Sequence, residues 1–210
     1  MMNNDVSPHD ELDALCSVFD TKCIQPNDIF LITGNDDVLA NAIMISICQQ
    51  LQPYLTFVNV YTAEDIQIPK DDVSYEQFIP ETCIFRNSQL SELESFLHQQ
   101  TEMIKRCMTT VSDMATRQAV ARRCQTLLIL DRCPSKWLHS QILQRSIQNR
   151  HTLQLTLIVR STDSITKIPP VVTQKVDFCF VLSASVGAEH NKLFNTVAGF
   201  APAIRDFRKI

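Results

Sequence analysis

Residues 29–37 read IFLITGNDD and continue directly into VLANAIMISICQQL at 38–51. The first five residues are apolar or β-branched, which is typical of a strand buried on both faces of a parallel sheet. GNDD predicts a turn, and the apolar spacing after it predicts a helix packed on that sheet. A further apolar run at 54–62, YLTFVNVYT, predicts the next strand. We therefore expect a βαβ unit with a right-handed crossover.

The same alternation continues to the end of the chain. We expect strands at 83–85, 126–131, 153–161 and 176–182, and helices at 91–124 (one or two), 137–150 and beyond residue 192. The acidic segment 63–82 contains two prolines and predicts a loop. These patterns predict a three-layer α/β fold with a mostly parallel sheet. Residues 1–27 are expected to form a polar, partly helical extension, and residues 28–210 a single domain.

Composition restricts the classes of function. Hydrophobic residues make up 45% and charged residues 20%, which is globular. The net charge of −4 gives no strong basic field that would by itself imply nucleic-acid binding. The eight cysteines form no CxxC pair and have no histidine cluster beside them, so no metal site is predicted. No signal peptide and no run of about 18 apolar residues is visible, so we expect an intracellular protein without a membrane span.

The turn after residue 33 lies where a P-loop would be. A P-loop reads GxxxxGK[ST] between a buried strand and a helix, and its backbone N–H groups hold phosphates. Gly34 matches the first glycine, whereas Leu39 replaces the second glycine, Ala40 the lysine and Asn41 the serine or threonine that binds magnesium. We therefore expect a P-loop-NTPase-like core with a degenerate Walker A loop.

The charges in this turn disfavour a triphosphate. Asn35 is followed by Asp36 and Asp37, and no cation is expected beside Gly34 to offset phosphate charge. Two readings remain open for these residues. GNDD could be only a turn and an N-cap, or it could be the remnant of a weak nucleotide site with altered geometry.

A second pattern ends at Asp131. P-loop ATPases hold magnesium with an acid at the end of a hydrophobic strand, and hydrolysing members usually add a second acid after it. The strand TLLILD at 126–131 ends in such an acid, but Arg132 follows it. Asp131 is thus either a remnant of a magnesium site or a cap for the next turn.

The segment 149–182 resembles the poxvirus-type DNA-packaging ATPases of large double-stranded DNA viruses, which belong to the FtsK/HerA superfamily. The resemblance rests on Arg150 and His151, the strand LQLTLIV, Lys167, Pro169, and the strand FCFVL after Asp177. It covers roughly residues 29–200. Arg150 and His151 are either caps of the preceding helix or groups at a subunit interface or on DNA.

The departures from this family determine the functional hypothesis. The loop lysine, the magnesium-binding hydroxyl and the second acid are absent, and the polar sensor position near Arg160 or Ser161 is not glutamine. The resemblance therefore implies a pseudo-ATPase, with no cofactor or at most weakly bound ATP and Mg²⁺. It would bind an active paralogue, a capsid component or a host protein, in the host cytoplasm or the virion, and possibly DNA.

Two alternatives are kept. The chain could be an active packaging-motor ATPase with a divergent loop, in which Lys22 or Lys70 replaces the missing lysine in trans. It could also be an unrelated α/β virion or host-interaction protein, which a different strand order would favour.

Overall fold

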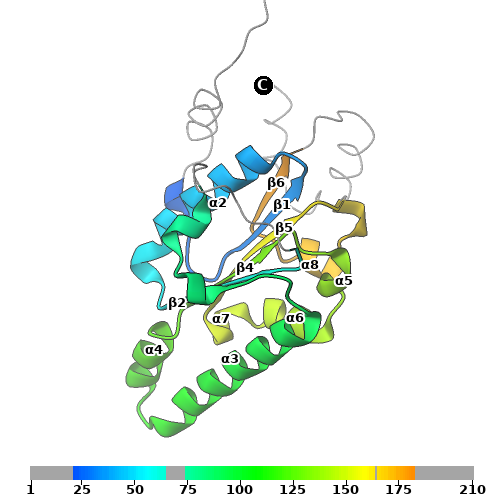
Figure 1. Ribbon diagram of the computed structural model, residues 1–210. Helices are drawn as coiled ribbons and strands as arrows, with labels where there is room; N and C mark the ends of the chain where they lie inside the picture. The colour runs from blue at the N-terminus through cyan, green and yellow to red at the C-terminus, as the bar shows by residue number, and fades with distance from the viewer. Residues whose placement is uncertain (1–20, 65–73, 164, 183–210) are drawn as a thin grey trace, which may run out of the picture.

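The computed structural model describes residues 21–64, 74–163 and 165–182, and these form one parallel sheet covered by helices (Figure 1). The six strands have the order β3-β2-β4-β5-β1-β6, and every neighbouring pair is parallel. The α/β class and the parallel sheet are therefore confirmed. The strands are β1 (Ile29–Gly34), β2 (Phe57–Thr62), β3 (Ile84–Phe85), β4 (Thr126–Asp131), β5 (Leu155–Ser161) and β6 (Phe178–Leu182).

Helices connect these strands. The α-helices are α2 (Asp37–Leu51), α3 (Leu90–Thr110), α4 (Met114–Arg122), α5 (Ser135–Leu138), α6 (Gln141–Gln148), α7 (Arg150–Leu153) and α8 (Pro170–Thr173). Single 3₁₀ turns are η1 (Thr21–Cys23), η2 (Gln52–Tyr54), η3 (Tyr75–Phe78), η4 (Glu81–Cys83) and η5 (Ile165–Lys167). None of the helices in the described part of the chain is both long and apolar enough to cross a bilayer.

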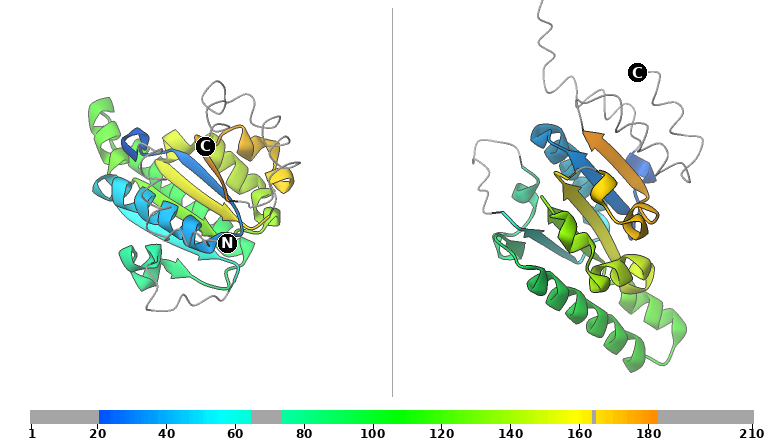
Figure 2. Two further views of the ribbon diagram at one scale, coloured as in Figure 1. Left: turned by 90° about the horizontal axis from the view of Figure 1, so that it is seen from above. Right: turned by 90° about the vertical axis from the view of Figure 1, so that its right-hand side faces the viewer.

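The sheet separates two apolar cores, because successive strand side chains point to opposite faces. On one face, Phe30 and Ile32 of β1 pack with α2 and η3. On the other, Ile29 and Leu31 pack with α3, α5 and α6. Figure 2 shows the resulting three layers, with α2 on one side of the sheet and α3 on the other. Strands β4 and β5 are fully buried, which agrees with the apolar run in the middle of each.

Several boundaries differ from the sequence prediction. The segment 91–124 forms two helices, which is one of the two possibilities predicted. The expected helix at 137–150, by contrast, is broken into α5, α6 and α7. The expected loop at 63–82 contains η3 and the start of η4. The predicted extension up to residue 20, Lys70 and the closing helix lie outside the described residues.

The strand order reverses direction at β1. The chain goes from β1 to strands on the β5 side, whereas the last described strand, β6, is added on the other side. In open parallel sheets, ligands bind outside the carboxyl ends of the strands where the order reverses in this way. Gly34 and Asp131 end their strands at this same edge of the sheet.

Candidate functional site

The connection between β1 and α2 is a tight turn. β1 ends at Gly34 and α2 begins at Asp37, with Asp36 as its N-cap. The Asp36 carboxylate accepts the backbone N–H of Leu39 at 2.9 Å, and its backbone carbonyl accepts that of Ala40 at 3.0 Å. Asp36 is thus the N-cap of α2. These two N–H groups, which a phosphate loop would point at its ligand, are already used inside the helix.

Gly34 is needed here for a steric reason. Its φ is +122°, a value that L-amino acids rarely adopt. A Cβ on this residue would lie 2.0 Å from the backbone oxygen of Leu182 in β6. Gly34 pairs with Leu182 in the sheet register. The glycine therefore allows β1 and β6 to approach at the end of the strand.

The positions aligned with the P-loop lysine and hydroxyl lie within α2. Ala40 is 1% exposed and packs in the core between α2 and the sheet. The side-chain oxygen of Asn41 accepts the backbone N–H of Tyr75 at 3.0 Å. Asn41 therefore joins α2 to η3. Asn35, in the turn before the helix, is exposed.

Two arginines reach the start of α2 from neighbouring strands. Arg160, the sixth residue of β5, donates from Nη2 to Oδ1 of Asp37. Arg132 follows β4 and donates from Nη2 to Oδ2 of Asp37 at 2.6 Å, and from Nη1 to Glu64 at 3.4 Å. The expectation that no cation lies beside the Gly34 turn is therefore wrong. Both guanidinium groups come from positions that follow Gly34 by about a hundred residues or more in the sequence.

Asp131 is held by two donors. Arg160 Nη1 donates to its Oδ1 at 3.0 Å, and the Tyr75 hydroxyl donates to its Oδ2 at 2.8 Å. Asp131 is 6% exposed, and Arg160 3%. Burial, followed by the charge and the hydrogen bond of Asp131, raises the pKa of Tyr75 well above its ordinary value, so the phenol stays protonated and donates. We call Asp37, Tyr75, Asp131, Arg132 and Arg160 the acid–arginine network.

The network differs from an ATP·Mg²⁺ site in what its groups contact. A phosphate would have to displace Asp37 from two guanidinium groups, and a magnesium ion would have to displace a guanidinium or a phenol from Asp131. Within the described residues, no three His, Cys, Asp or Glu side chains are grouped to hold a metal ion. As arranged, the carboxylates and guanidinium groups of the network pair with one another.

Sequence reasoning found part of this network. Asp37 and Asp131 were candidates, and Arg132 and Arg160 were noted only as replacements for catalytic residues. Tyr75 was missed because it lies in a segment expected to be a loop, and no periodicity marks it. Its contact with Asp131 joins residues 56 positions apart, which only the strand order reveals.

Arg150 and His151 lie at the opposite edge of the sheet. Arg150 pairs with Asp177 at 3.1 Å, and Asp177 also accepts the backbone N–H of Ile29, the first residue of β1. A strand of six residues separates this edge from the acid–arginine network by about 20 Å. Arg150 therefore joins α7 to the amino ends of β1 and β6, whereas His151 is exposed. The structure does not bring either residue to Gly34.

Comparisons by sequence give no relative, since neither a family model nor a curated protein matches. Solved structures do match. B204, the DNA-packaging ATPase of Sulfolobus turreted icosahedral virus, is 10% identical, with a TM-score of 0.50 over 83% of this chain and 84% of that one. The genome-packaging NTPase B204 of Sulfolobus turreted icosahedral virus 2, in complex with ATP-gammaS, is also 10% identical, with a TM-score of 0.51 over 84% and 85%.

ATPases 2 and 3 of EssC from Geobacillus thermodenitrificans give a TM-score of 0.51 at 13% identity. The match covers 84% of this chain and 35% of the EssC chain. At these identities the likeness concerns the fold. This chain has the α/β fold of P-loop NTPases, with structural neighbours among viral DNA-packaging ATPases and EssC ATPase domains.

Proposed function

We propose that this chain does not hydrolyse ATP and acts as a binding or structural module on a P-loop NTPase fold. The acid–arginine network is the observation that carries the proposal. Its two carboxylates, Asp37 and Asp131, and its two guanidinium groups already pair with one another where phosphates and magnesium would bind. The interpretation of Gly34 to Asn41 and Asp131 as remnants of a nucleotide site belongs to this proposal.

The chemistry of phosphoryl transfer supports it. The reaction depends on positioned cations that offset charge on the transferring group, and each such group contributes several kcal/mol. Here Ala40 is in the core, Asn41 binds Tyr75, and the basic Arg132 follows Asp131 where hydrolysing members have an acid. The turn also lacks the length of a P-loop, since only Asn35 and Asp36 separate β1 from α2. Combined losses of this size would abolish turnover.

The partner follows by analogy with the structural neighbours. Two of them are described as packaging DNA or a genome, so we place the chain beside such a machine, intracellularly in a host cell or virion. An active paralogue, a capsid component or a host protein is the expected partner, and DNA is the second class to test.

The direct test measures ATP binding and phosphate release by the purified full chain with Mg²⁺. We expect no saturable ATP binding by calorimetry and no phosphate release above that of buffer. Asp131→Ala is the matched variant, because it removes the one acid that a magnesium site would need. Micromolar ATP binding with turnover that Asp131→Ala abolishes would refute the proposal.

A second candidate is a divergent active ATPase, and one observation favours it. Arg132 and Arg160 supply two cations at the start of α2, and they would face phosphates if the exposed Asp37 carboxylate moved aside. Asp37→Ala separates the candidates. If only the Asp37→Ala variant binds ATP, the Asp37 carboxylate blocks the two arginines in the wild type, as the first candidate requires. If the wild type binds and hydrolyses ATP, the chain is an active ATPase.

A further inference from the structure

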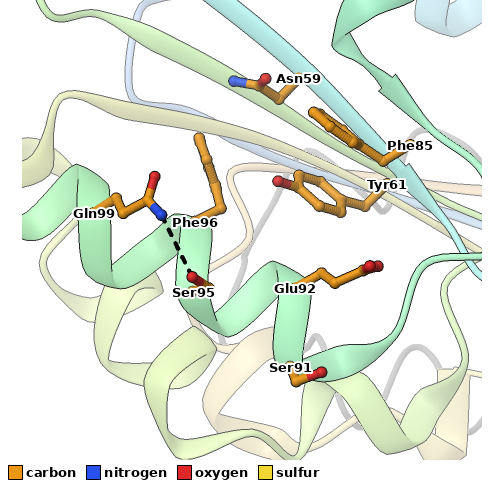
Figure 3. Close-up of a pocket in the computed structure, with 8 residues that line it drawn as sticks. All are labelled: Asn59, Tyr61, Phe85, Ser91, Glu92, Ser95, Phe96 and Gln99. Carbon is orange, nitrogen blue, oxygen red and sulfur yellow. Dashed lines mark hydrogen bonds between the residues drawn. The ribbon is translucent and has the colours of Figure 1, made fainter.

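A pocket of about 510 Å³ lies between the sheet and α3, and no residue of the acid–arginine network lines it (Figure 3). Strands β2 and β3 supply one wall and the first half of α3 the other. Its principal lining residues are Asn59, Tyr61, Phe85, Glu92, Phe96 and Gln99. None of these side chains belongs to the acid–arginine network.

Three aromatic rings form the apolar part of the pocket. Tyr61 stacks on Phe85 with ring centroids 4.8 Å apart and planes 17° from parallel. Phe96 is tilted by 41° against Tyr61 at 5.7 Å. Phe85 keeps 39% of its surface exposed at the edge of the sheet. Ring faces carry negative charge density, so such a wall attracts a cation as well as apolar groups.

Glu92 is the one charged side chain among the residues that line the pocket. One carboxylate oxygen accepts the backbone N–H of Gln89 at 2.9 Å in the capping box of α3. The charge of this carboxylate also acts on Tyr61, one of the three rings. Burial first, and then the charge of Glu92, raises the pKa of Tyr61 to about 12. The phenol therefore stays neutral and keeps its hydrogen at ordinary pH.

The cation nearest in sequence to this wall is already paired. Arg86 follows Phe85, and its guanidinium group contacts Glu76 at 2.7 Å and Glu81 at 2.5 Å. Among the described residues no basic side chain forms an ion pair with Glu92, so its negative charge can pair with a group from outside. The side-chain amides of Asn59 and Gln99 provide further oxygen acceptors on the rim of the same pocket.

We infer that this pocket binds a guanidinium group, stacked on the aromatic wall and paired with Glu92. A guanidinium group is planar, stacks on aromatic faces and carries five N–H donors, which suits a pocket of rings and side-chain oxygens. The group would come either from an arginine side chain of a protein partner or from a small free guanidinium compound. The inference does not rest on the proposed loss of ATPase activity.

The test is an NMR titration of the full chain with Nα-acetyl-arginine methylamide. The neutral analogue, Nα-acetyl-citrulline methylamide, has nearly the same shape and no charge. We expect saturable shifts of the Asn59 and Gln99 side-chain amides with the arginine compound and not with the citrulline compound. Equal responses to both, or no saturable response to arginine, would overturn the inference. Agmatine distinguishes the source, since tighter binding of agmatine indicates a free compound and weaker binding a protein side chain.

Two variants test the residues. Glu92→Gln removes the charge but keeps the capping box, because glutamine also serves at this helix position. We expect about threefold weaker binding, the size of one exposed ion pair. Glu102→Gln makes the same charge change on α3 outside the pocket and should leave affinity unchanged. Phe85→Leu should also weaken binding about threefold by removing a ring face. Equal affinities for Glu92→Gln and Glu102→Gln would contradict the assigned site.

Discussion

Arg132 combines an unusual backbone conformation with two ion pairs. Its φ is +49°, a left-handed conformation that costs a non-glycine residue of order 1 kcal/mol. In this conformation the next residue, Cys133, donates its N–H to the carbonyl of Arg160 at 2.7 Å. The side chain reaches Asp37 and Glu64. The strained turn after β4 therefore places a cation over the end of the sheet.

Gly34 provides the sharpest prediction for a single residue. Gly34→Ala should lower the free energy of unfolding by about 3 kcal/mol, since it combines an unfavourable φ with a clash against backbone. The clash is with the Leu182 oxygen, at 2.0 Å from the added Cβ, and neither backbone can move without breaking the pairing of β1 with β6. Urea denaturation monitored by circular dichroism measures the difference.

Asn35→Ala is the control for this measurement, because Asn35 is the exposed next residue in the same turn. We expect a change within about 0.5 kcal/mol for it. Similar stabilities of Gly34→Ala and Asn35→Ala would show that β6 does not approach β1 as closely as described.

At the scale of elements, the buried strands were predictable because each is a short apolar run bounded by polar residues. β1, β4 and β5 stand out in this way. Helix α2 was predictable from its apolar spacing, and Asp36 from its type as a capping residue. Periodicity carries no information on which strands are neighbours. The convergence of Arg160, Asp131 and Asp37 depends on β5 lying between β1 and β4, so it could not be read from the chain.

The turn after Gly34 is one residue shorter than the sequence predicts. The helix expected at 38–51 begins at Asp37. An aspartate N-cap followed by another aspartate starts a helix early, since negative charge is favoured in a first helical turn. A family pattern that matches only one glycine does not fix the length of the turn.

Helices α3 and α4 suggest a test with oxidant. Cys107 of α3 and Cys124, two residues after α4, have Sγ atoms 4.0 Å apart as free thiols. Diamide should oxidise this pair to a disulfide, taking up the two electrons and two protons that the thiols release. The new link should stabilise the chain by about 3 kcal/mol by closing the loop between the two residues. Non-reducing electrophoresis with mass spectrometry detects the bond.

Cys107→Ser should prevent the link, and Cys83→Ser should leave it unchanged, because Cys83 lies on η4 near β3. If both variants lose the same cross-link, or if diamide gives only dimers, α3 and the end of α4 are not packed as the structure places them.

At the scale of the whole molecule, the two cores that enclose the sheet also hold groups that must keep their protons. Burial raises the pKa of Cys48 and of Cys179 from 9.0 to about 12 each, and raises that of Cys133 further. Tyr61 and Tyr75 are shifted in the same direction. In the unfolded chain these groups ionise near their ordinary values. The folded state therefore binds more protons than the unfolded state in alkaline solution.

The stability of the chain should fall as the pH rises above about 9, because the unfolded state gains free energy by releasing protons that the folded state retains. Each thiol with a raised pKa contributes about 1.4 kcal/mol per pH unit between its unfolded and folded pKa values. Urea denaturation between about pH 8 and pH 11 under reducing conditions measures this slope. The double variant Cys48→Ala/Cys179→Ala should reduce it by about 3 kcal/mol per pH unit, whereas Cys23→Ala removes an exposed thiol and should not. If the free energy of unfolding of the wild type and of the double variant changed equally with pH, water would reach both thiols. The packing of α2 on the sheet and the contacts of β6 would then be looser than the structure shows.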